Sequence, residues 1–427
     1  MSGLPWEALA PGWAVKPGLE RVNVLLDRLD HPERKFPAIH VGGTNGKGSV
    51  VAFLEAALGA GGVKVGTYTS PDLGDPTERI RVAAQSISAG GLDELVRRAI
   101  LPLDDLVAGP GRPTSFEALT AAAFGHFAAQ RVELALVEVG LGGRFDATRA
   151  LARPLLSIVT SVEQDHRDFF GPGTGRAAWE KAGIARSGVP FLTAERKPEV
   201  LATFAQECRE VGAALVLVDP EDVEPVEVSW DRAVWRSRDD PLGLGQFETR
   251  LLGLYQRGNL ALALAALAEL VGGFPVPREA IREGLGTAAW AGRFEVLSRR
   301  PYIVLDGAHN PAGSRALVAT LEHLPRPRGT STLVFGVLRD KVVREMAEIL
   351  FPWFDRVVLV ASRSERALPP AALAHQARRL GCKWCIGGPV GPAVSDVVRD
   401  LGEEDMLVIC GSLTVVGEAR RALVPAP

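Results

Sequence analysis

One short glycine-rich segment constrains the fold of this chain more than any other feature. Residues 42–49 read Gly-Gly-Thr-Asn-Gly-Lys-Gly-Ser, with the apolar run Ala38–Val41 just before them and the helix-like run Val50–Leu58 just after. A strand, a glycine-rich loop and a helix in this order form a phosphate cradle, because glycines let backbone N–H groups turn inward and a helix N-terminus is partly positive. Lys47 would supply an ammonium for the outer phosphates. The segment therefore predicts a nucleoside triphosphate site.

The spacing of this loop differs from that of the common P-loop. Val41 stands where the first glycine is usual, and Gly48 separates Lys47 from the hydroxyl of Ser49. This variation points to a particular subfamily of phosphate-binding loops.

The composition excludes several classes of protein. A chain of 427 residues with 47% hydrophobic content can bury a large core, and we expect two domains. A net charge of −3 gives no global cationic field, so nucleic acid is not an expected partner. No uncharged apolar run is long enough to cross a bilayer, and residues 1–7 lack the pattern of a signal peptide. We therefore expect a cytoplasmic protein without a membrane partner.

The four cysteines are too few for a disulfide framework in a chain of this length. Cys382 and Cys385 form one C-x-x-C pair, a pattern found in half of a zinc site or in a redox pair. Cys208 and Cys410 are single, however, and no histidine pair has matching spacing. We expect a structural role for all four cysteines.

Short β-branched runs alternate with Ala- and Leu-rich stretches, which is typical of parallel βαβ units and predicts an α/β fold. The strands form two series, separated by a region rich in Trp, Asp and Glu and by the helix-like stretch Asn259–Val271. We place a boundary near residue 291, which gives domains 1–291 and 292–427. The expected strands are Ala38–Val41, Val63–Thr69, Leu134–Val139, Leu155–Thr160, Val189–Thr193, Tyr302–Leu305, Thr332–Phe335, Arg356–Val360 and Met406–Ile409.

Polar residues follow several of these strands, at the sheet edge where open parallel sheets bind ligands. Ser70 ends the second strand, and Glu138 lies near the end of the third. A carboxylate leaving a buried strand needs a partner, and magnesium is a natural one in a phosphoryl-transfer site. The alternatives are a simple turn at Ser70, and a helix cap or an ion pair with Arg144 for Glu138. Asp165 and His166 follow the next strand, and we favour a metal-facing role for His166.

Two further segments are candidates for function. Lys181, one of only eight lysines, lies among small residues, although a solvated surface lysine is the ordinary alternative. In the second domain, the strand Tyr302–Leu305 leads straight into Asp306-Gly307-Ala308-His309-Asn310-Pro311. Three hydrogen-bonding side chains at one strand end indicate a second site facing the first, with a polar loop and a helix cap as the alternative.

These segments together resemble one known family. The combination is similar to the folylpolyglutamate synthase/dihydrofolate synthase family of the Mur ligase superfamily, and the matches occur in family order from about residue 20 to residue 420. The segments that carry the resemblance are Gly43–Ser49, Thr69–Pro71, Val139–Thr148, Asp165-His166, Glu180–Ile184, Gly292–Glu295 and Asp306–Pro311.

The resemblance implies an ATP-dependent amide ligase. Its expected fold is an N-terminal P-loop domain, with a mainly parallel sheet flanked by helices, and a smaller C-terminal Rossmann-like α/β domain. The carboxylate of a folate or of dihydropteroate would take the γ-phosphoryl group of ATP, and the amine of L-glutamate would then displace phosphate. A carboxylate is a poor acyl donor, so activation is needed, and cations must neutralise the charge between phosphate and carboxylate.

The resemblance also assigns roles to individual residues. Lys47 would hold the outer phosphates, and Lys181 matches a lysine that becomes carbamylated in this superfamily. Ser70 and Glu138 match ligands of one Mg²⁺, and His166 matches a ligand of a second. The remaining assignments are ATP binding by Gly43, Thr44, Asn45, Gly46, Gly48, Ser49, Asn259, Arg293 and Asp306, glutamate binding by His309 and Ser412, and a pterin-side acid at Asp146.

Three residues depart from the family pattern. Asp72 stands where the family commonly has His after Thr-Ser-Pro, Arg149 follows Asp-Ala-Thr where Asn is common, and Tyr255 precedes Gln256 where His is common. None of them changes the predicted phosphate or metal residues, so the ligase interpretation is unaffected. The departures bear on the pterin end of the acceptor site.

Two alternative functions share part of this pattern. Another Mur-type ligase, acting on a cell-wall precursor, would share the ATP site, but Thr69–Pro71 followed by Glu78–Ile80 disfavours it. A P-loop nucleotide switch would not explain the polar set of the second domain, and a guanine-reading Asn-Lys-x-Asp segment is absent. We expect a monomer, and the sequence leaves open which acceptor is used.

Overall fold

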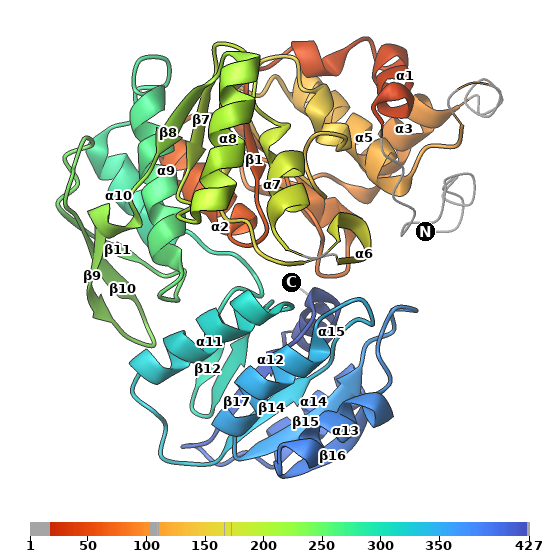
Figure 1. Cartoon of the computed structure of the whole chain (residues 1–427), viewed down its shortest axis with the longest axis vertical. Coiled ribbons are helices and arrows are strands. Elements are labelled where there is room, and N and C mark those ends of the chain that lie inside the picture. Colours follow the sequence, from red (N-terminus) through yellow and green to blue (C-terminus); the bar gives the residue numbers. More distant parts are fainter. Residues whose placement is uncertain (1–17, 102–108, 110, 166, 172, 425–427) are drawn as a thin grey trace.

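The computed structural model describes residues 18–101, 109, 111–165, 167–171 and 173–424. Within them, two large α/β sheets lie one after the other along the chain, and Figure 1 shows them as the upper and lower parts of the molecule. The α/β fold class predicted from the sequence is confirmed, and all nine predicted strands are present. Among the described residues, no helix is both long and apolar enough to cross a membrane.

The first sheet has eight strands in the order β4-β3-β2-β5-β1-β6-β7-β8. The six strands from β2 to β8 run parallel, whereas β3 and β4 form an antiparallel edge. Their bounds are β1 Ala38–Gly42, β2 Val65–Tyr68, β3 Ile80–Val82, β4 Gln85–Ser86, β5 Leu134–Glu138, β6 Pro154–Val159, β7 Pro190–Thr193 and β8 Ala214–Leu217.

Helices cover both faces of this sheet because its central strands are apolar on both sides. Ile39 and Leu136 belong to the core that includes α2 and α9, whereas Ala38 and Val137 belong to a second core with α1, α3 and α5. Successive side chains thus alternate between the two faces. The helices are α1 Glu20–Arg28, α2 Lys47–Ala60, α3 Ala89–Ile100, α5 Ser115–Gln130, α6 Arg167–Phe170, α7 Gly175–Ala182, α8 Pro198–Val211, α9 Gln256–Leu270 and α10 Arg278–Thr287.

A small antiparallel sheet occupies the region that the sequence marked as rich in Trp, Asp and Glu. Its order is β11-β10-β9, with β9 Val223–Val228, β10 Ala233–Ser237 and β11 Gln246–Thr249. It packs against α9 and α10, and the indole of Trp235 is buried there and donates a hydrogen bond to the hydroxyl of Thr249. This sheet was not predicted, because its strands mix buried and exposed positions and lack long apolar runs.

The second large sheet has six strands in the order β12-β13-β17-β14-β15-β16, and only β12 at its edge is antiparallel. All six strands lie after residue 291, although the exact domain boundary remains a prediction. The elements are β12 Glu295–Arg299, β13 Tyr302–Leu305, α11 Pro311–His323, β14 Ser331–Phe335, α12 Val343–Leu350, β15 Arg356–Ala361, α13 Pro370–Arg379, β16 Trp384–Pro389, α14 Val390–Arg399, β17 Met406–Cys410 and α15 Leu413–Leu423.

Candidate active site

A cavity of about 1180 Å³ lies between the two large sheets. One side consists of the glycine-rich loop and the residues that follow β2, β5 and β6, and the other side consists of residues that follow β13 and β17. Strand-end residues from both sheets therefore meet in one space, as the strand-end pattern of the sequence predicts.

The glycine-rich loop has the geometry of a phosphate cradle. Gly43 and Gly46 have φ angles of 140° and 89°, and a Cβ at Gly46 would collide with the side chain of Asn259. Lys47 begins α2, and its Nζ donates to the carbonyl oxygens of Gly43 (3.1 Å) and Thr44 (3.2 Å). The lysine thus folds back over a loop whose backbone only glycine adopts readily, at the positive end of a 14-residue helix.

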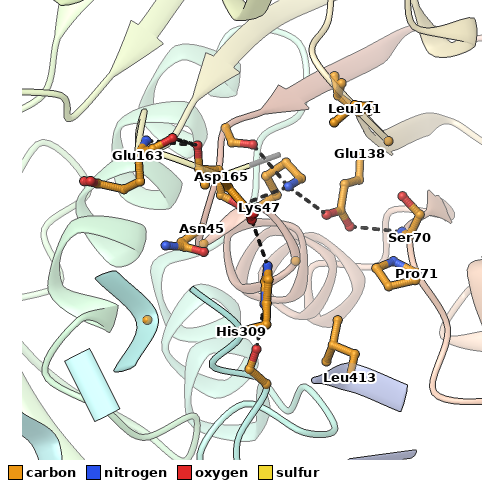
Figure 2. Close-up of a pocket in the computed structure, with 18 of the residues that line it drawn as sticks. Asn45, Lys47, Ser70, Pro71, Glu138, Leu141, Glu163, Asp165, His309 and Leu413 are labelled. Atoms are coloured by element: carbon orange, nitrogen blue, oxygen red, sulfur yellow. Dashed lines mark hydrogen bonds and ion pairs between the residues drawn. The ribbon is translucent and has the colours of Figure 1, made fainter. Parts of the chain in front are cut away.

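Glu138 ends β5 and is buried at 4% exposure beside this lysine. Its Oε1 is 3.7 Å from Lys47 Nζ, and its Oε2 accepts a hydrogen bond from the backbone N–H of Ser70 at 3.2 Å (Figure 2). Burial raises the pKa of this carboxyl, while Lys47, the Ser70 amide and the charge of Arg293 oppose the rise. Of the alternatives considered for Glu138, the ion pair with Arg144 is wrong, because Arg144 pairs with Glu207.

These oxygens fit a divalent cation. The Glu138 carboxylate and the neighbouring Ser70 hydroxyl are hard oxygen donors, which Mg²⁺ prefers. The described residues contain no cluster of three His, Cys, Asp or Glu side chains that could hold a metal. Magnesium in phosphoryl-transfer sites commonly uses one or two protein carboxylates together with substrate phosphates and water, so a small protein donor set is compatible with it. His166, the predicted ligand of a second ion, lies outside the described residues.

Lys181 lies on α7 at 5% exposure and faces the same loop. Its Nζ donates to the carbonyl oxygen of Gly43 at 3.0 Å. Burial, helped by the charge of Lys47, lowers the pKa of Lys181 to about 7, with Asp165 among the groups that oppose the shift. The alternative of a solvated surface lysine is therefore wrong, and a large fraction of the amine is uncharged near neutral pH.

Asp165 connects the two sheets through a network that the sequence analysis predicted only in part. Its Oδ2 is 3.2 Å from His309 Nε2, and its Oδ1 is 2.6 Å from the Nζ of Lys341, both residues of the second sheet's unit (Figure 2 shows the histidine contact). His309 is fixed further by a 2.8 Å contact between its Nδ1 and the carbonyl oxygen of Gly307. Lys341 was missed, although its place in the loop after β14 was a usable signal.

A reciprocal amide pair joins the two sheets beside this network. Asn310 Nδ2 donates to Asn45 Oδ1 at 3.0 Å, and Asn45 Nδ2 donates to Asn310 Oδ1 at 3.3 Å. Asn310 also caps α11 by accepting from the N–H of Gly313 at 2.8 Å. Asn310 is thus a helix cap, as the alternative for this segment proposed, and it also contacts the glycine-rich loop.

Arg293 and Asp306 line the cavity from the side of the second sheet, and the charge of Arg293 acts on Glu138. Asp306 accepts from the N–H groups of Phe294 (2.9 Å) and Ala308 (2.8 Å) and from the hydroxyl of Tyr255 (3.3 Å). Burial raises the pKa of Asp306, and the charge of Arg293 opposes this rise. Tyr255, one of the three departures from the family pattern, is the N-cap of α9. Its hydroxyl therefore adds a hydrogen bond from α9 to Asp306 in the unit of the second sheet.

The predicted nucleotide, glutamate and pterin residues lie around the same cavity. Asn259 is buried and donates to the side chain of Gln256 at 2.8 Å. Ser412 is the N-cap of α15, and the hydroxyl groups of Ser412 and Thr414 are 2.9 Å apart. Asp146 is committed to local structure, because its two oxygens accept from the N–H groups of Thr148 and Leu141. All three predicted residues line the cavity.

The second departure from the family pattern, Arg149, has a structural partner. Its Nε donates at 2.7 Å to the carbonyl oxygen of Gly183, directly after the end of α7. A cation at a helix C-terminus interacts favourably with the helix dipole. Arg149 thus supports the helix that carries Lys181.

Comparisons with known proteins agree with this geometry. A model described as "Mur ligase, glutamate ligase domain" matches residues 292–413. The dihydrofolate synthase/folylpolyglutamate synthase of Bacillus subtilis is 34% identical over 430 residues, which covers 96% of each chain.

Solved structures match over nearly the whole chain. A structure of Escherichia coli FolC in complex with DHPP and ADP has a TM-score of 0.84 and 30% identity, covering 98% of this chain and 96% of that one. The bifunctional folylpolyglutamate synthase/dihydrofolate synthase of Yersinia pestis, complexed with AMPPNP and a Mn ion, has a TM-score of 0.80 and 29% identity, covering 97% and 95%.

The fold and the site define a P-loop enzyme in which a second α/β unit completes the cavity beside the glycine-rich loop, the arrangement of an ATP-dependent ligase. The chain belongs to the folylpolyglutamate synthase/dihydrofolate synthase family, and its reaction is the ATP-dependent addition of glutamate to folates. Family membership decides against the two alternatives, a cell-wall ligase and a nucleotide switch.

Proposed function

We propose that the cavity activates the acceptor acid as an acyl phosphate. The observation that carries this proposal is the meeting of Lys47, Glu138 and the Asp165–His309 contact in one cavity between the two sheets. A carboxylate oxygen of the acceptor attacks the γ-phosphorus and ADP leaves. The amine of glutamate then attacks the acyl carbon, and phosphate departs with the former carboxylate oxygen. Lys47 and the backbone N–H groups of the loop stabilise the negative charge of the transferred phosphoryl group during both steps.

The chain's own residues divide the remaining tasks. Arg293 and Asp306 approach the nucleotide's phosphates and ribose from the second sheet's side, and Asn259 with Gln256 lies at the adenine side. His309 and Ser412 hold the incoming glutamate, and Asp146 shapes the pterin side of the acceptor site. The support for these roles is that all of these residues except Gln256 line the same cavity as Lys47.

We propose two Mg²⁺ ions, one held by Ser70 and Glu138 and one by His166. Bound there, the ions would supply positive charge that neutralises the phosphates and the acceptor carboxylate. The buried Glu138, whose only positive partner within 4 Å among the described residues is Lys47, is the support for the first ion.

We further propose that Lys181 is carbamylated. An amine must be uncharged to attack CO₂, and the pKa of about 7 makes Lys181 reactive near neutral pH. The carbamate would replace a buried cation with an anion next to Lys47 and the proposed metal ligands. Its oxygens would support magnesium from the side of α7.

Phosphate release tests the proposed reaction. The purified protein is incubated with ATP and magnesium and with dihydropteroate, dihydrofolate or tetrahydrofolate in turn, each with and without L-glutamate. We expect release that requires both an acid acceptor and glutamate, and the active acceptors decide whether the enzyme adds the first glutamate, extends a chain or does both. Release that ignores glutamate for every acceptor would refute the proposal. The monomeric state, the cytoplasmic location and the boundary at residue 291 stay predictions.

A further inference from the structure

The loop between β2 and β3 carries an ion pair that the roles above do not use. Asp72 Oδ2 accepts a hydrogen bond from Arg79 Nε at 2.5 Å, and the two side chains are only 17% and 20% exposed. Among the described residues, no other group bonds to the Arg79 guanidinium, and Arg79 lines the cavity. The pair therefore fixes one edge of a planar cation and leaves its two terminal amino groups available to a ligand.

Arg79 lies close to the place where the phosphoryl group and the acceptor meet. Its carbonyl oxygen accepts from the N–H of Thr69 at 2.9 Å, and the next residue, Ser70, donates its N–H to Glu138. Glu138 in turn faces Lys47 at 3.7 Å. The backbone of Arg79 is thus one strand spacing from the predicted metal ligand Ser70.

The loop that positions this pair is held at two points. The N–H of Leu73 donates to the carboxylate of Glu78 at 2.8 Å, and Arg421 on α15 donates to the carbonyl oxygen of Leu73 at 2.6 Å. A Cβ at Gly417 would collide with the same carbonyl oxygen, so α15 packs directly on the loop. Asp72 therefore lies on a restrained loop segment, which is what a positioning residue requires.

The possible acceptors differ at the end that reacts. Dihydropteroate has one carboxylate, and this group itself must receive the phosphoryl group. A glutamylated folate has the reacting carboxylate and, on the same glutamyl residue, a second one that stays free. Arginine binds a carboxylate through two parallel N–H groups, which gives both affinity and orientation.

We propose that Arg79, positioned by Asp72, binds the non-reacting carboxylate of a glutamylated acceptor and so sets the preference between glutamylated and unglutamylated acids. The inference rests on the proposed function, because it assumes that the acceptor acid reacts beside Lys47 and Glu138.

Four variants test the proposal through KM and kcat for dihydropteroate and for dihydrofolate. Arg79→Gln should raise the KM of dihydrofolate at least about tenfold more than that of dihydropteroate, because a buried bidentate contact is lost. Arg79→Lys keeps the charge but lacks the two parallel N–H groups, so it should give an intermediate ratio of the two KM values. Asp72→Ala should raise the KM of dihydrofolate relative to that of dihydropteroate, with little change in kcat. Asp72→Asn keeps an oxygen that accepts a hydrogen bond from Arg79 Nε, so its ratio of the two KM values should stay close to that of the wild type.

Asp30→Asn is the control, since it removes a carboxylate from an exposed ion pair with Lys35, and neither residue lines the cavity. If one acceptor is not turned over, its inhibition constant against the other replaces its KM. Equal changes for both acceptors in Arg79→Gln and Arg79→Lys would overturn the inference, as would an Asp72→Ala variant that alters only kcat. Wild-type protein that releases no glutamate-dependent phosphate with any acceptor would instead refute the proposed function itself.

Discussion

Lys47 is the residue on which the proposed phosphate chemistry depends most directly. Its ammonium donates to two loop carbonyl oxygens and faces the carboxylate of Glu138. We expect Lys47→Met to lower glutamate-dependent phosphate release by at least about 100-fold while the chain still folds, as judged by its circular dichroism spectrum. Lys35→Met, which removes an exposed lysine, is the control. Retained turnover in Lys47→Met would show that the phosphates bind elsewhere.

Lys181 gives a prediction about stability and pH. Burial lowers the pKa of Lys181 to about 7 in the folded protein, whereas the unfolded chain keeps the ordinary lysine pKa of 10.5. Between these pH values the unfolded state binds more protons, so the contribution of Lys181 to the free energy of unfolding rises with pH. In CO₂-free buffer, urea unfolding should give Lys181→Met a higher free energy of unfolding than the wild type near pH 7. This difference should shrink as the pH approaches 10. A pH-independent difference would contradict the burial argument.

Carbamylation of Lys181 has its own signature. Wild-type protein equilibrated with ¹³C-bicarbonate should show a carbamate carbon signal by NMR, since the uncharged amine attacks CO₂. Lys181→Met should lack the signal, and Lys197→Met, which removes a partly buried lysine that does not line the cavity, should keep it. A wild-type spectrum without the signal under these conditions would count against the modification.

At the scale of elements, the predicted strands were those whose apolar runs are buried on both faces. β1 and β5 were predicted because every one of their residues is buried. β4 and β16 were missed because they are edge strands with exposed residues, and edge strands do not carry a continuous apolar run. The polar strand-end residues could be predicted as a set, because parallel strands end at one edge.

Helix α7 is the element on which the proposed Lys181 chemistry depends. Arg149 donates to the carbonyl oxygen of Gly183 just beyond this helix, but it also lies near Arg186, whose pKa is lowered to about 9 by burial and by Arg149. Arg149→Asn should therefore lower the free energy of unfolding by only about 1 kcal/mol. Hydrogen exchange should report faster exchange of the α7 amides, with those of α2 unaffected. Unchanged exchange in α7 would mean that Arg149 does not support the helix.

At the scale of the whole molecule, the contacts between the two sheets are the part that the sequence could not supply. Lys341 and Asp165 are separated by 176 positions, and nothing local to either residue indicates the other. The same is true of Asn45 and Asn310, whose amide pair depends on how the two sheets face each other. Such pairings require the tertiary arrangement, whereas the phosphate loop is encoded by adjacent residues.

The Lys341–Asp165 pair should hold the two sheets together in the absence of ligands. Both side chains are buried, and removing Lys341 takes away a cation that lies 2.6 Å from the carboxylate of Asp165. We expect Lys341→Met to increase the radius of gyration in solution scattering and to speed proteolysis between the two sheets. Lys383→Met, at an exposed position, should do neither. Identical scattering profiles for Lys341→Met and wild type would show that other contacts hold the arrangement.

Activation of an acid by phosphorylation is the central claim, and an isotope measurement tests it most directly. The acceptor is prepared with ¹⁸O in its reacting carboxylate and turned over with ATP, magnesium and L-glutamate. Because the carboxylate oxygen that attacks the γ-phosphorus leaves with phosphate, the account predicts one ¹⁸O atom in each phosphate released, detected by mass spectrometry. Phosphate that carries no ¹⁸O, formed while glutamate is still added to the acceptor, would contradict the acyl-phosphate route.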